Sequence, residues 1–516
     1  MKSATILMKA ALCGFLALCS CTKKFGETNI DKNSIAQIGP AELPFLFSGA
    51  IASVPWGDQV AQNLFADQYA QYFACNVTYF PSDRLVIVMD WAQNHFDPIY
   101  TRVVPQLQAI FEATEENSAE HALAQVWWVY AFHRVTDYWG PIPYFKAGEP
   151  ASSVPYDPQD KIYDDFFKRL DAAVAILKNH TGETPYGSYD IMYGGNVNKW
   201  IKFANTLRLR LALRISKADP ARARTEAEAA YAAGVFAASP EDDAYVLKSN
   251  NDNNRLSVMS DWNEFRMSAA MESVMKGYND PRLPEYFIPA VGSGTYEGLR
   301  NGLSNAQLAA PANQASANSH VGPRWSSPAA GGIASFLTTP WAVMTAAEAY
   351  FLRAEGALLG WSMGGTAKEL YETGITNSMK QWGIADNAAI QQYINSAAVP
   401  VAPGDFLNSP ALSNIPVKFH AASAAIQLEQ IATQKWLCLF PDGVEAWAEY
   451  RRNHLPKLYP VANSDNPDIS DPSTQWIRRM PFLLSEKISN GPEVEKAVGL
   501  LGGEDKITTP LWWDKN

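Results

Sequence analysis

The chain has 516 residues, of which 47% are hydrophobic, 18% charged and 12% aromatic. The hydrophobic fraction is enough for a large core and excludes a wholly disordered chain. The formal net charge of −11 argues against nucleic-acid binding, which needs a basic surface. After residue 21 only Cys75 and Cys438 remain, too few for a zinc knuckle or a disulfide framework. At roughly 150 residues per domain, the length alone allows about three domains.

The N-terminus has the features of an export signal. Residues 1–20 carry Lys2 and Lys9 and a short apolar run, which fits a secretory signal peptide and is too short to span a bilayer. The run ends Leu-Cys-Ser-Cys, which resembles a bacterial lipoprotein box in which Cys21 is lipidated. The alternative is an ordinary cleaved signal peptide with a chance cysteine. Residues 21–34 are polar and predict a short lipid tether.

The body of the chain reads as mainly α-helical. Apolar residues recur every three or four positions, and turns containing glycine or proline separate the runs. This pattern predicts about four helical hairpins of the tetratricopeptide type, the first of them over residues 58–112. Thr339-Pro340 is expected to cap one of the later helices, which Gly360 ends. The clearest helices are predicted over residues 119–139, 163–180, 197–216, 220–236, 340–360 and 367–383.

Long loops interrupt this pattern. Residues 240–338 are rich in Gly, Pro, Asn and Ser, which predicts a loop-rich insert with short elements. Residues 395–425 and 457–475 have a similar composition. A helical scaffold with long aromatic-bearing loops usually carries its function in those loops.

Few motifs indicate catalysis or metal binding. Residues 360–364 match the G-x-S-x-G nucleophile motif, but a predicted helix precedes Ser362 where the motif needs a strand. His133 lies in an apolar helix and is expected to be a core residue. The run from Asn250 to Asn254 offers oxygen ligands for calcium without the EF-hand spacing, so calcium is a minor alternative to the absence of a cofactor. A pair of carboxylates acting in glycoside hydrolysis stays open.

Several stretches, in order along the chain, resemble the SusD/RagB-like family of outer-membrane nutrient-binding lipoproteins of the Bacteroidetes, and more closely its SusD-like-2 branch. The stretches are TDYWGPIPY (136–144), NKWIKFANTLRLR (198–210), AEAYFLRAE (347–355) followed by Gly360-Trp361, QKW (434–436), EAWAEYRR (445–452), RRMP (478–481) and LWW (511–513). Each stretch alone is a weak signal, but their order across nearly the whole chain is specific.

The resemblance implies a fold, a location and a role. The fold would be one α-helical domain over residues 35–516, with four tetratricopeptide-like hairpins and irregular loops. The protein would be lipid-anchored in the outer membrane and face the cell exterior. It would bind oligosaccharides and deliver them, without catalysis, to a SusC-like TonB-dependent transporter. Lys23-Lys24 follow the lipid cysteine where many exported relatives carry acidic residues, which is a departure from the family pattern.

Sugars present apolar C–H faces ringed by hydroxyl groups, which suits aromatic platforms flanked by hydrogen-bonding side chains. For each candidate residue the competing explanation is local packing beneath a loop. Three rival hypotheses stay open: a transporter lid for peptides or another non-glycan nutrient, a surface glycan hydrolase, and a purely structural adaptor. The predicted ligand-binding residues are Tyr79, Phe80, Asp83, Arg84, Trp91, Trp262, Tyr296, Arg300 and Trp325.

Overall fold

The structure is a computed structural model that describes residues 38–54, 58–151, 153–326 and 336–515. The chain divides into two compact units, Met1–Leu43 and Pro44–Asn516, and the architecture below is that of the second. The predicted signal peptide, Cys21 and the tether lie outside the described residues. Among the helices in the described part of the chain, none is both long and apolar enough to cross a membrane.

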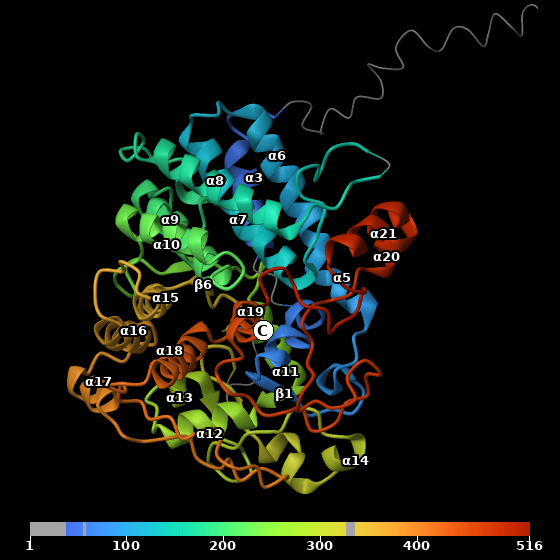
Figure 1. The fold of residues 1–516 in the computed structure, drawn as a ribbon, viewed down its shortest axis with the longest axis vertical. Helices are drawn as coiled ribbons and strands as arrows, with labels where there is room; N and C mark the ends of the chain where they lie inside the picture. The colour runs from blue at the N-terminus through green and yellow to red at the C-terminus, as the bar shows by residue number, and fades with distance from the viewer. Residues whose placement is uncertain (1–37, 55–57, 152, 327–335, 516) are drawn as a thin grey trace, which may run out of the picture. The chain divides into compact units, whose positions relative to one another are not determined.

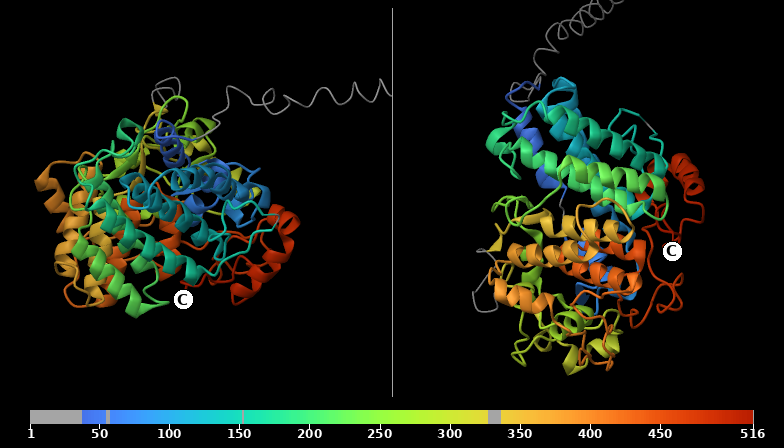
Figure 2. Two further views of the ribbon diagram at one scale, coloured as in Figure 1. Left: turned by 90° about the horizontal axis from the view of Figure 1, so that it is seen from above. Right: turned by 60° about the vertical axis from the view of Figure 1, so that its left-hand side comes forward.

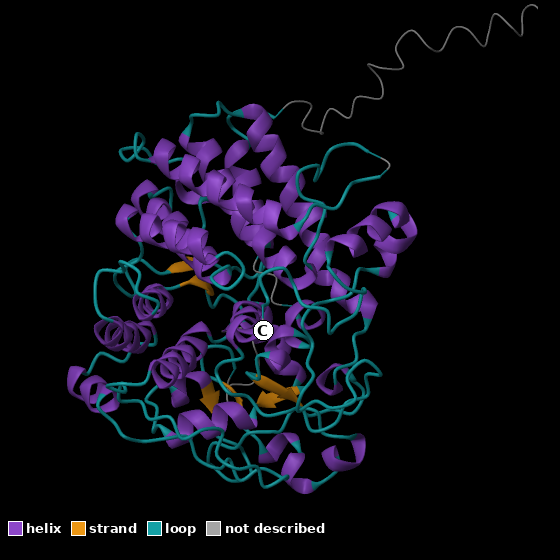
Figure 3. Cartoon of the chain, viewed as in Figure 1, coloured by secondary structure: helices purple, strands orange, loops and turns teal. Residues whose placement is uncertain are grey.

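The predicted mainly α-helical fold is confirmed (Figures 1 and 3). Helices supply most of the regular structure, and loops join them over long stretches. In chain order the helices are α3 (Leu43–Ser53), α4 (Ala66–Tyr69), α5 (Met89–Pro98), α6 (Val104–Ala113), α7 (Ala119–Trp139), α8 (Gln159–Leu177), α9 (Val197–Arg214), α10 (Pro220–Ala233), α11 (Arg255–Trp262), α12 (Ala269–Gly277), α13 (Leu283–Tyr286), α14 (Asn305–Leu308), α15 (Ala346–Leu358), α16 (Ala367–Gln381), α17 (Asn387–Ile394), α18 (Ala424–Leu439), α19 (Gly443–Asn453), α20 (Leu484–Ser489) and α21 (Gly491–Leu500).

Short strands form small antiparallel pairs between the helices. The pairs join segments that are far apart in the sequence, so each one closes a large loop of the chain. The pairs are β1 (Phe73–Cys75) with β3 (Phe265–Met267), β2 (Ala244–Val246) with β6 (Trp341–Met344), and β4 (Phe287–Ile288) with β5 (His320–Val321).

Neighbouring helices pack side by side, as Figure 2 shows for the α7–α10 and α15–α18 groups. Helix α7 packs on α8, α9 on α10, and α15 on both α16 and α18. The predicted pairing of residues 163–180 with 197–216 corresponds to the contact between α8 and α9. The predicted hairpin over residues 58–112 consists of the short helices α4, α5 and α6 with π-helical segments at Gln59–Asn63 and Ile99–Val103.

One predicted helix boundary is wrong. The helix expected to begin at Thr339-Pro340 begins at Ala346, and the side chain of Thr345 caps it by accepting from the Glu348 amide. Residues Trp341–Met344 instead form strand β6, in which Trp341 pairs with Val246 of β2. The helical periodicity in this stretch is overridden because a strand far away in the sequence supplies backbone hydrogen bonds.

The loop-rich insert predicted over residues 240–338 is present as a series of short elements. It contains β2 to β5 and the helices α11 to α14, of which α12 is the longest with nine residues. Loops connect these elements, and two of the pairings reach outside the insert, to β1 and to β6. The insert is therefore fastened to both earlier and later parts of the chain.

A buried ionic network joins the helices that carry the family-like stretches. Arg210 of α9 donates to Glu348 of α15 at 2.6 Å, and Arg452 of α19 donates to Glu355 of α15, also at 2.6 Å. Both arginines are almost fully buried, so each needs these carboxylates as partners. The network also includes Asp137, Arg214, Lys435, Glu445 and Glu449.

Candidate functional site

Strand pairing brings two distant loops together at the surface. Strand β1 pairs with β3 so that the loop after β1 lies beside the loop before β3. The amide of Asn76 donates to the carbonyl of Glu264 at 3.2 Å, and the side chain of Asn76 donates to the carbonyl of Asn263 at 3.1 Å. The loop that carries Tyr79 therefore lies beside the turn that directly follows Trp262, the last residue of α11.

Three of the predicted ligand-binding residues form a cluster, which we call the surface aromatic group: Tyr79, Phe80 and Trp91. The ring centroids of Tyr79 and Phe80 lie 4.7 Å apart, and those of Phe80 and Trp91 lie 5.6 Å apart. Tyr79 is 61% exposed, and Trp262 at the end of α11 is 47% exposed. The exposed rings leave apolar faces available to a ligand.

A carboxylate holds this group in place. The Tyr79 hydroxyl donates to Glu264, and this hydrogen bond raises the pKa of Tyr79 to about 12. Gln59 donates to the same carboxylate at 2.6 Å. Glu264 thus orients an exposed aromatic ring and adds a charged acceptor beside it.

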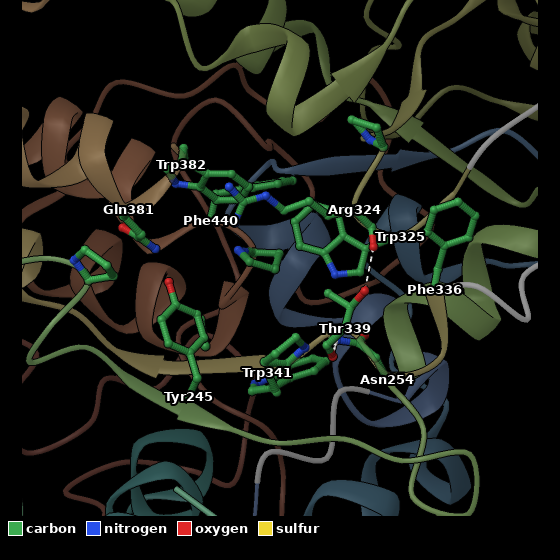
Figure 4. A pocket seen from close by; sticks show the side chains of 15 residues that line it. Tyr245, Asn254, Arg324, Trp325, Phe336, Thr339, Trp341, Gln381, Trp382 and Phe440 are labelled. Atoms are coloured by element: carbon green, nitrogen blue, oxygen red, sulfur yellow. Dashed lines mark hydrogen bonds between the residues drawn. The ribbon is translucent and has the colours of Figure 1, made fainter. Parts of the chain in front are cut away.

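A second feature, which we call the aromatic cavity, encloses about 430 Å³. This volume lies within the usual range of small-molecule sites. Figure 4 shows side chains from separate segments directed into it, among them the predicted residue Trp325. The cavity is lined by Pro240, Tyr245, Asn254, Pro323, Arg324, Trp325, Phe336, Thr339, Pro340, Trp341, Ala342, Gln381, Trp382, Phe440 and Pro441.

Polar groups are placed among these aromatic walls. The Arg324 guanidinium lies 4.2 Å from the centroid of the Trp382 ring (Figure 4). The indole N–H of Trp382 and the side-chain oxygen of Gln381 are buried without a hydrogen-bond partner. Burial raises the pKa of Tyr245 above its usual range, so its hydroxyl stays protonated. Such groups can serve a ligand that carries both donors and acceptors.

Helix α11 runs between the aromatic cavity and the neighbourhood of the surface aromatic group. Its N-cap residue Asn254 lines the cavity and donates to the carbonyl of Thr339 at 2.9 Å. Its last residue is the exposed Trp262. An eight-residue helix is about 12 Å long, so this is roughly the distance along α11 between its cavity end and Trp262.

Other predicted residues are buried in contacts that hold loops together. Asp83 accepts from the Asn301 side chain and the Gly302 amide, both at 2.8 Å, and burial raises its pKa to about 6. Arg84 donates to Asp465 at 2.5 Å. Arg300 donates to the carbonyl of Pro460 at 2.7 Å. A direct ligand contact by these residues stays a prediction.

Two further predicted residues occupy different positions. Tyr296 is half-buried, and among the described residues no ring contact joins it to the surface aromatic group. Trp325 is 4% exposed and lies 5.8 Å from Phe440 and 5.9 Å from Trp382, measured between ring centroids. Trp325 therefore belongs to the cavity, apart from the surface aromatic group.

The sequence interpretation missed much of the cavity wall. It assigned Trp382 to a helix packing face and Trp341 to a helix, and it did not single out Tyr245 or Phe440. A local signal was present, since Trp341 follows a proline and Trp382 precedes a glycine, which places both at element boundaries. Only the tertiary fold shows that these side chains converge.

The structure also places the residues considered for calcium binding and for the G-x-S-x-G motif. Asn254, at the end of the run considered for calcium, caps α11 by accepting from the Leu256 amide at 3.0 Å. In the part of the chain that the structure describes, no group of three His, Cys, Asp or Glu residues is placed to hold a metal ion. Ser362 follows helix α15, as expected, and its amide donates to Glu228 at 2.9 Å.

The comparisons with known proteins agree with this architecture. Residues 32–514 match the SusD-like family model, described as "Susd and RagB outer membrane lipoprotein". The chain therefore belongs to the SusD-like family of outer-membrane lipoproteins. No curated protein matches the chain.

Solved structures of SusD homologues match nearly the whole chain. A chitin-binding SusD homologue from Flavobacterium johnsoniae is 35% identical with a TM-score of 0.82, covering 92% of this chain and 98% of its own. A SusD homologue from Bacteroides uniformis is 32% identical with a TM-score of 0.81, covering 92% and 99%. A protein described as chitin-binding is 27% identical with a TM-score of 0.75, covering 93% and 100%.

Proposed function

We propose that this protein is a cell-surface lipoprotein that binds oligosaccharides and delivers them to a SusC-like TonB-dependent transporter without catalysis. The observation that carries the proposal is the aromatic cavity, whose size and aromatic walls suit the C–H faces of sugar rings. Membership of the SusD-like family supports the same function.

The proposal includes how the chain is organised and anchored. Residues 1–20 are removed as a signal peptide, and Cys21 receives the lipid in the outer membrane. Residues 21–34 form the tether, and residues 35–516 form one binding domain that faces the cell exterior. We also place the chain in the SusD-like-2 branch, on the resemblance of its ordered stretches. The transporter partner is inferred from the family.

Chitin oligosaccharides are the first ligands to test. The Flavobacterium johnsoniae relative is described as chitin-binding. The cavity of this chain offers an unpartnered donor on Trp382 and an unpartnered acceptor on Gln381, and an N-acetyl group carries one acceptor and one donor. The surface aromatic group would contact further rings of the same chain.

The test measures binding of chitin and other glycan oligosaccharides to the purified protein by calorimetry. Trp325→Ala removes one aromatic wall and is expected to weaken binding about tenfold or more. Trp382→Phe keeps an aromatic ring in the cavity wall but removes the indole N–H. Weaker binding by this variant would therefore report a lost hydrogen bond to the ligand and not a loss of folding. Trp361→Ala, in the turn between α15 and α16, is the matched control and should bind normally.

The rival hypotheses give different outcomes. Release of shorter sugars, abolished by a substitution in one carboxylate pair, would establish a hydrolase. Binding of peptides with no affinity for any glycan would assign a non-glycan cargo. Transporter binding without any small ligand would leave a structural adaptor. Equal glycan affinity in wild type, Trp325→Ala and Trp382→Phe would remove the cavity from the proposal.

A further inference from the structure

The wall of the aromatic cavity carries a positive charge. Of the described residues that line it, Arg324 is the one charged side chain, and none is an aspartate or a glutamate. This charge contrasts with the formal net charge of −11 of the whole chain. A ligand that enters the cavity therefore meets a guanidinium group and no acidic side chain on the wall.

Contacts on both sides fix the backbone of Arg324. The residue lies in the turn that follows β5, where the amide of Gly322 donates to the carbonyl of Tyr286 at 2.8 Å. The amide of Trp325 closes the turn by donating to the carbonyl of Gly322 at 3.0 Å. The hydroxyl of Thr339 donates to the carbonyl of Arg324 itself at 2.7 Å. The charged side chain therefore starts from a defined place on the cavity wall.

An aromatic ring orients the guanidinium group. The guanidinium of Arg324 lies over the Trp382 ring, 4.2 Å from its centroid (Figure 4), and Trp382 is only 4% exposed. A guanidinium that rests on a ring by its flat face keeps its N–H groups available for acceptors in its own plane. Trp382 thus holds the charge in place without using its hydrogen-bonding capacity.

The carboxylate that approaches this guanidinium is a weak partner. Nε of Arg324 lies 3.6 Å from Oε2 of Glu285, which is too long for a hydrogen bond. The two side chains are 34% and 36% exposed, and ion pairs at such positions contribute little. Glu285 belongs to α13 and does not line the cavity. The N–H groups of Arg324 can therefore bind a second, better placed anion.

The size and the neutral groups of the cavity suit a sugar ring beside this charge. The volume of about 430 Å³ equals about 14 waters at about 30 Å³ each, which is room for one ring with its substituents. The indole N–H of Trp382 and the side-chain oxygen of Gln381 line the cavity without a hydrogen-bond partner. Water can satisfy these neutral groups, but it brings no charge to match the guanidinium.

We propose that Arg324 selects oligosaccharides that carry an acidic group, so that the cavity takes a sugar ring bearing a carboxylate or a sulfate ester. Both groups offer two neighbouring oxygens to the N–H groups along one edge of a guanidinium. The inference rests on the proposed glycan-binding function. It adds a charged group that chitin, a neutral polymer, does not carry.

The test measures by calorimetry the affinity of the full chain for acidic oligosaccharides and for their neutral derivatives. Galacturonic-acid and hyaluronan oligosaccharides carry carboxylates, and their methyl esters are the neutral derivatives. A carrageenan oligosaccharide carries sulfate, and its desulfated form is the neutral derivative. We expect an acidic probe to bind about tenfold or more tightly than its derivative, as a charged hydrogen-bonded pair allows. The larger of the two ratios identifies carboxylate or sulfate as the group that is bound.

Three variants assign this preference to Arg324. Arg324→Gln removes the charge and is expected to bring the affinities for the acidic probe and its neutral derivative to within about twofold of each other. Glu285→Gln removes the competing carboxylate and is expected to raise the affinity for the acidic probe alone about two- to fivefold. Arg224→Gln, in the ion pair with Glu228 on α10, makes the same change outside the cavity and should alter neither affinity.

The outcomes separate this inference from the proposed function. Binding of chitin oligosaccharides, with equal affinities for the acidic probes and their derivatives, would overturn the role of Arg324 and leave the glycan-binding function. A preference for acidic probes that persists in Arg324→Gln would also overturn it. No binding of any oligosaccharide would remove the proposed function and this inference with it. If Arg324→Gln folds poorly, Glu285→Gln still decides, because unchanged affinity for the acidic probe in that variant contradicts the inference.

Discussion

At the scale of single residues, burial changes the chemistry of several carboxyl groups. Asp67 in α4 is almost fully buried and accepts from the side chain of Gln62 at 2.9 Å. Burial raises the pKa of Asp67 to about 7, with Asp442 adding to the effect. A raised pKa means that the folded state holds its proton more tightly than the unfolded state does.

The consequence is a pH-dependent contribution to stability. The contribution of Asp67 is fully present below about pH 4 and is lost as the pH rises through about 7. Asp67→Asn removes this titration while keeping an acceptor for Gln62. Between pH 5 and 8, the free energy of unfolding of the wild type should therefore fall by about 2 kcal/mol more than that of the variant.

Urea unfolding at the two pH values measures this difference. Asp468→Asn makes the same change at an exposed position and should give a curve parallel to the wild type. If the free energy of unfolding of Asp67→Asn changes with pH as much as that of the wild type, Asp67 titrates normally in the folded protein.

At the scale of elements, the loops lie so close to the helices that single glycines matter. Gly277 ends helix α12, and a Cβ added there would lie 2.4 Å from the carbonyl oxygen of Val399 and 2.5 Å from the Cα of Pro400. The neighbouring loop cannot withdraw a side chain to make room, because the contacts are with its backbone. The packing of α12 on this loop therefore requires glycine.

We expect Gly277→Ala to lower the free energy of unfolding by about 1–3 kcal/mol, as overpacking does. The matched control is Gly499→Ala in helix α21, where an added Cβ meets no atom within 4 Å. Alanine favours the helix there, so the control should gain about 0.5–1 kcal/mol. Thermal and urea unfolding check both values. The decisive result is a lower free energy of unfolding for Gly277→Ala together with a higher one for Gly499→Ala.

At the scale of the whole molecule, the buried ionic network connects the first and second halves of the sequence. Burial alone would raise the pKa of Glu355, but Arg452 and Lys435 lower it to about 2. Because this pKa is depressed, the stability that Glu355 contributes is present above about pH 4.5 and is lost as the pH falls toward 2. The network therefore stabilises the fold at neutral pH and weakens it in acid.

Glu355→Gln leaves the buried Arg452 and Lys435 without this carboxylate. We expect a loss of about 3–5 kcal/mol at pH 7, the usual effect of breaking a buried ion pair from one side. Glu372→Gln breaks the exposed pair with Lys368 and should cost less than about 1 kcal/mol. Chemical unfolding at pH 7 and pH 3 checks both values. A similar small loss for both variants would mean that the network adds little to stability.

The sequence predicted the helical body well, because helix periodicity and capping are local. Helix α16, for example, begins with a capping box in which Thr366 and Glu369, three residues later, cap each other, a pattern set by neighbours in the chain. The family-like stretches 198–210, 347–355 and 445–452 lie in the buried helices α9, α15 and α19. The start of α15 was mispredicted because Trp341–Met344 pairs with β2, about a hundred residues earlier, and no local pattern encodes that partner.

In the candidate site, too, features built from residues close in the sequence differ from features built from distant segments. The grouping of Tyr79, Phe80 and Trp91 follows from their closeness on one loop-rich segment, and their contact with a ligand stays a prediction. The aromatic cavity depended on the tertiary structure, because Tyr245, Trp325, Trp382 and Phe440 come from four separate segments. The sequence by itself determined the scaffold and the kind of side chain available to a ligand. Only the fold decided which of those side chains share one cavity, because convergence depends on contacts between distant segments that no local pattern records.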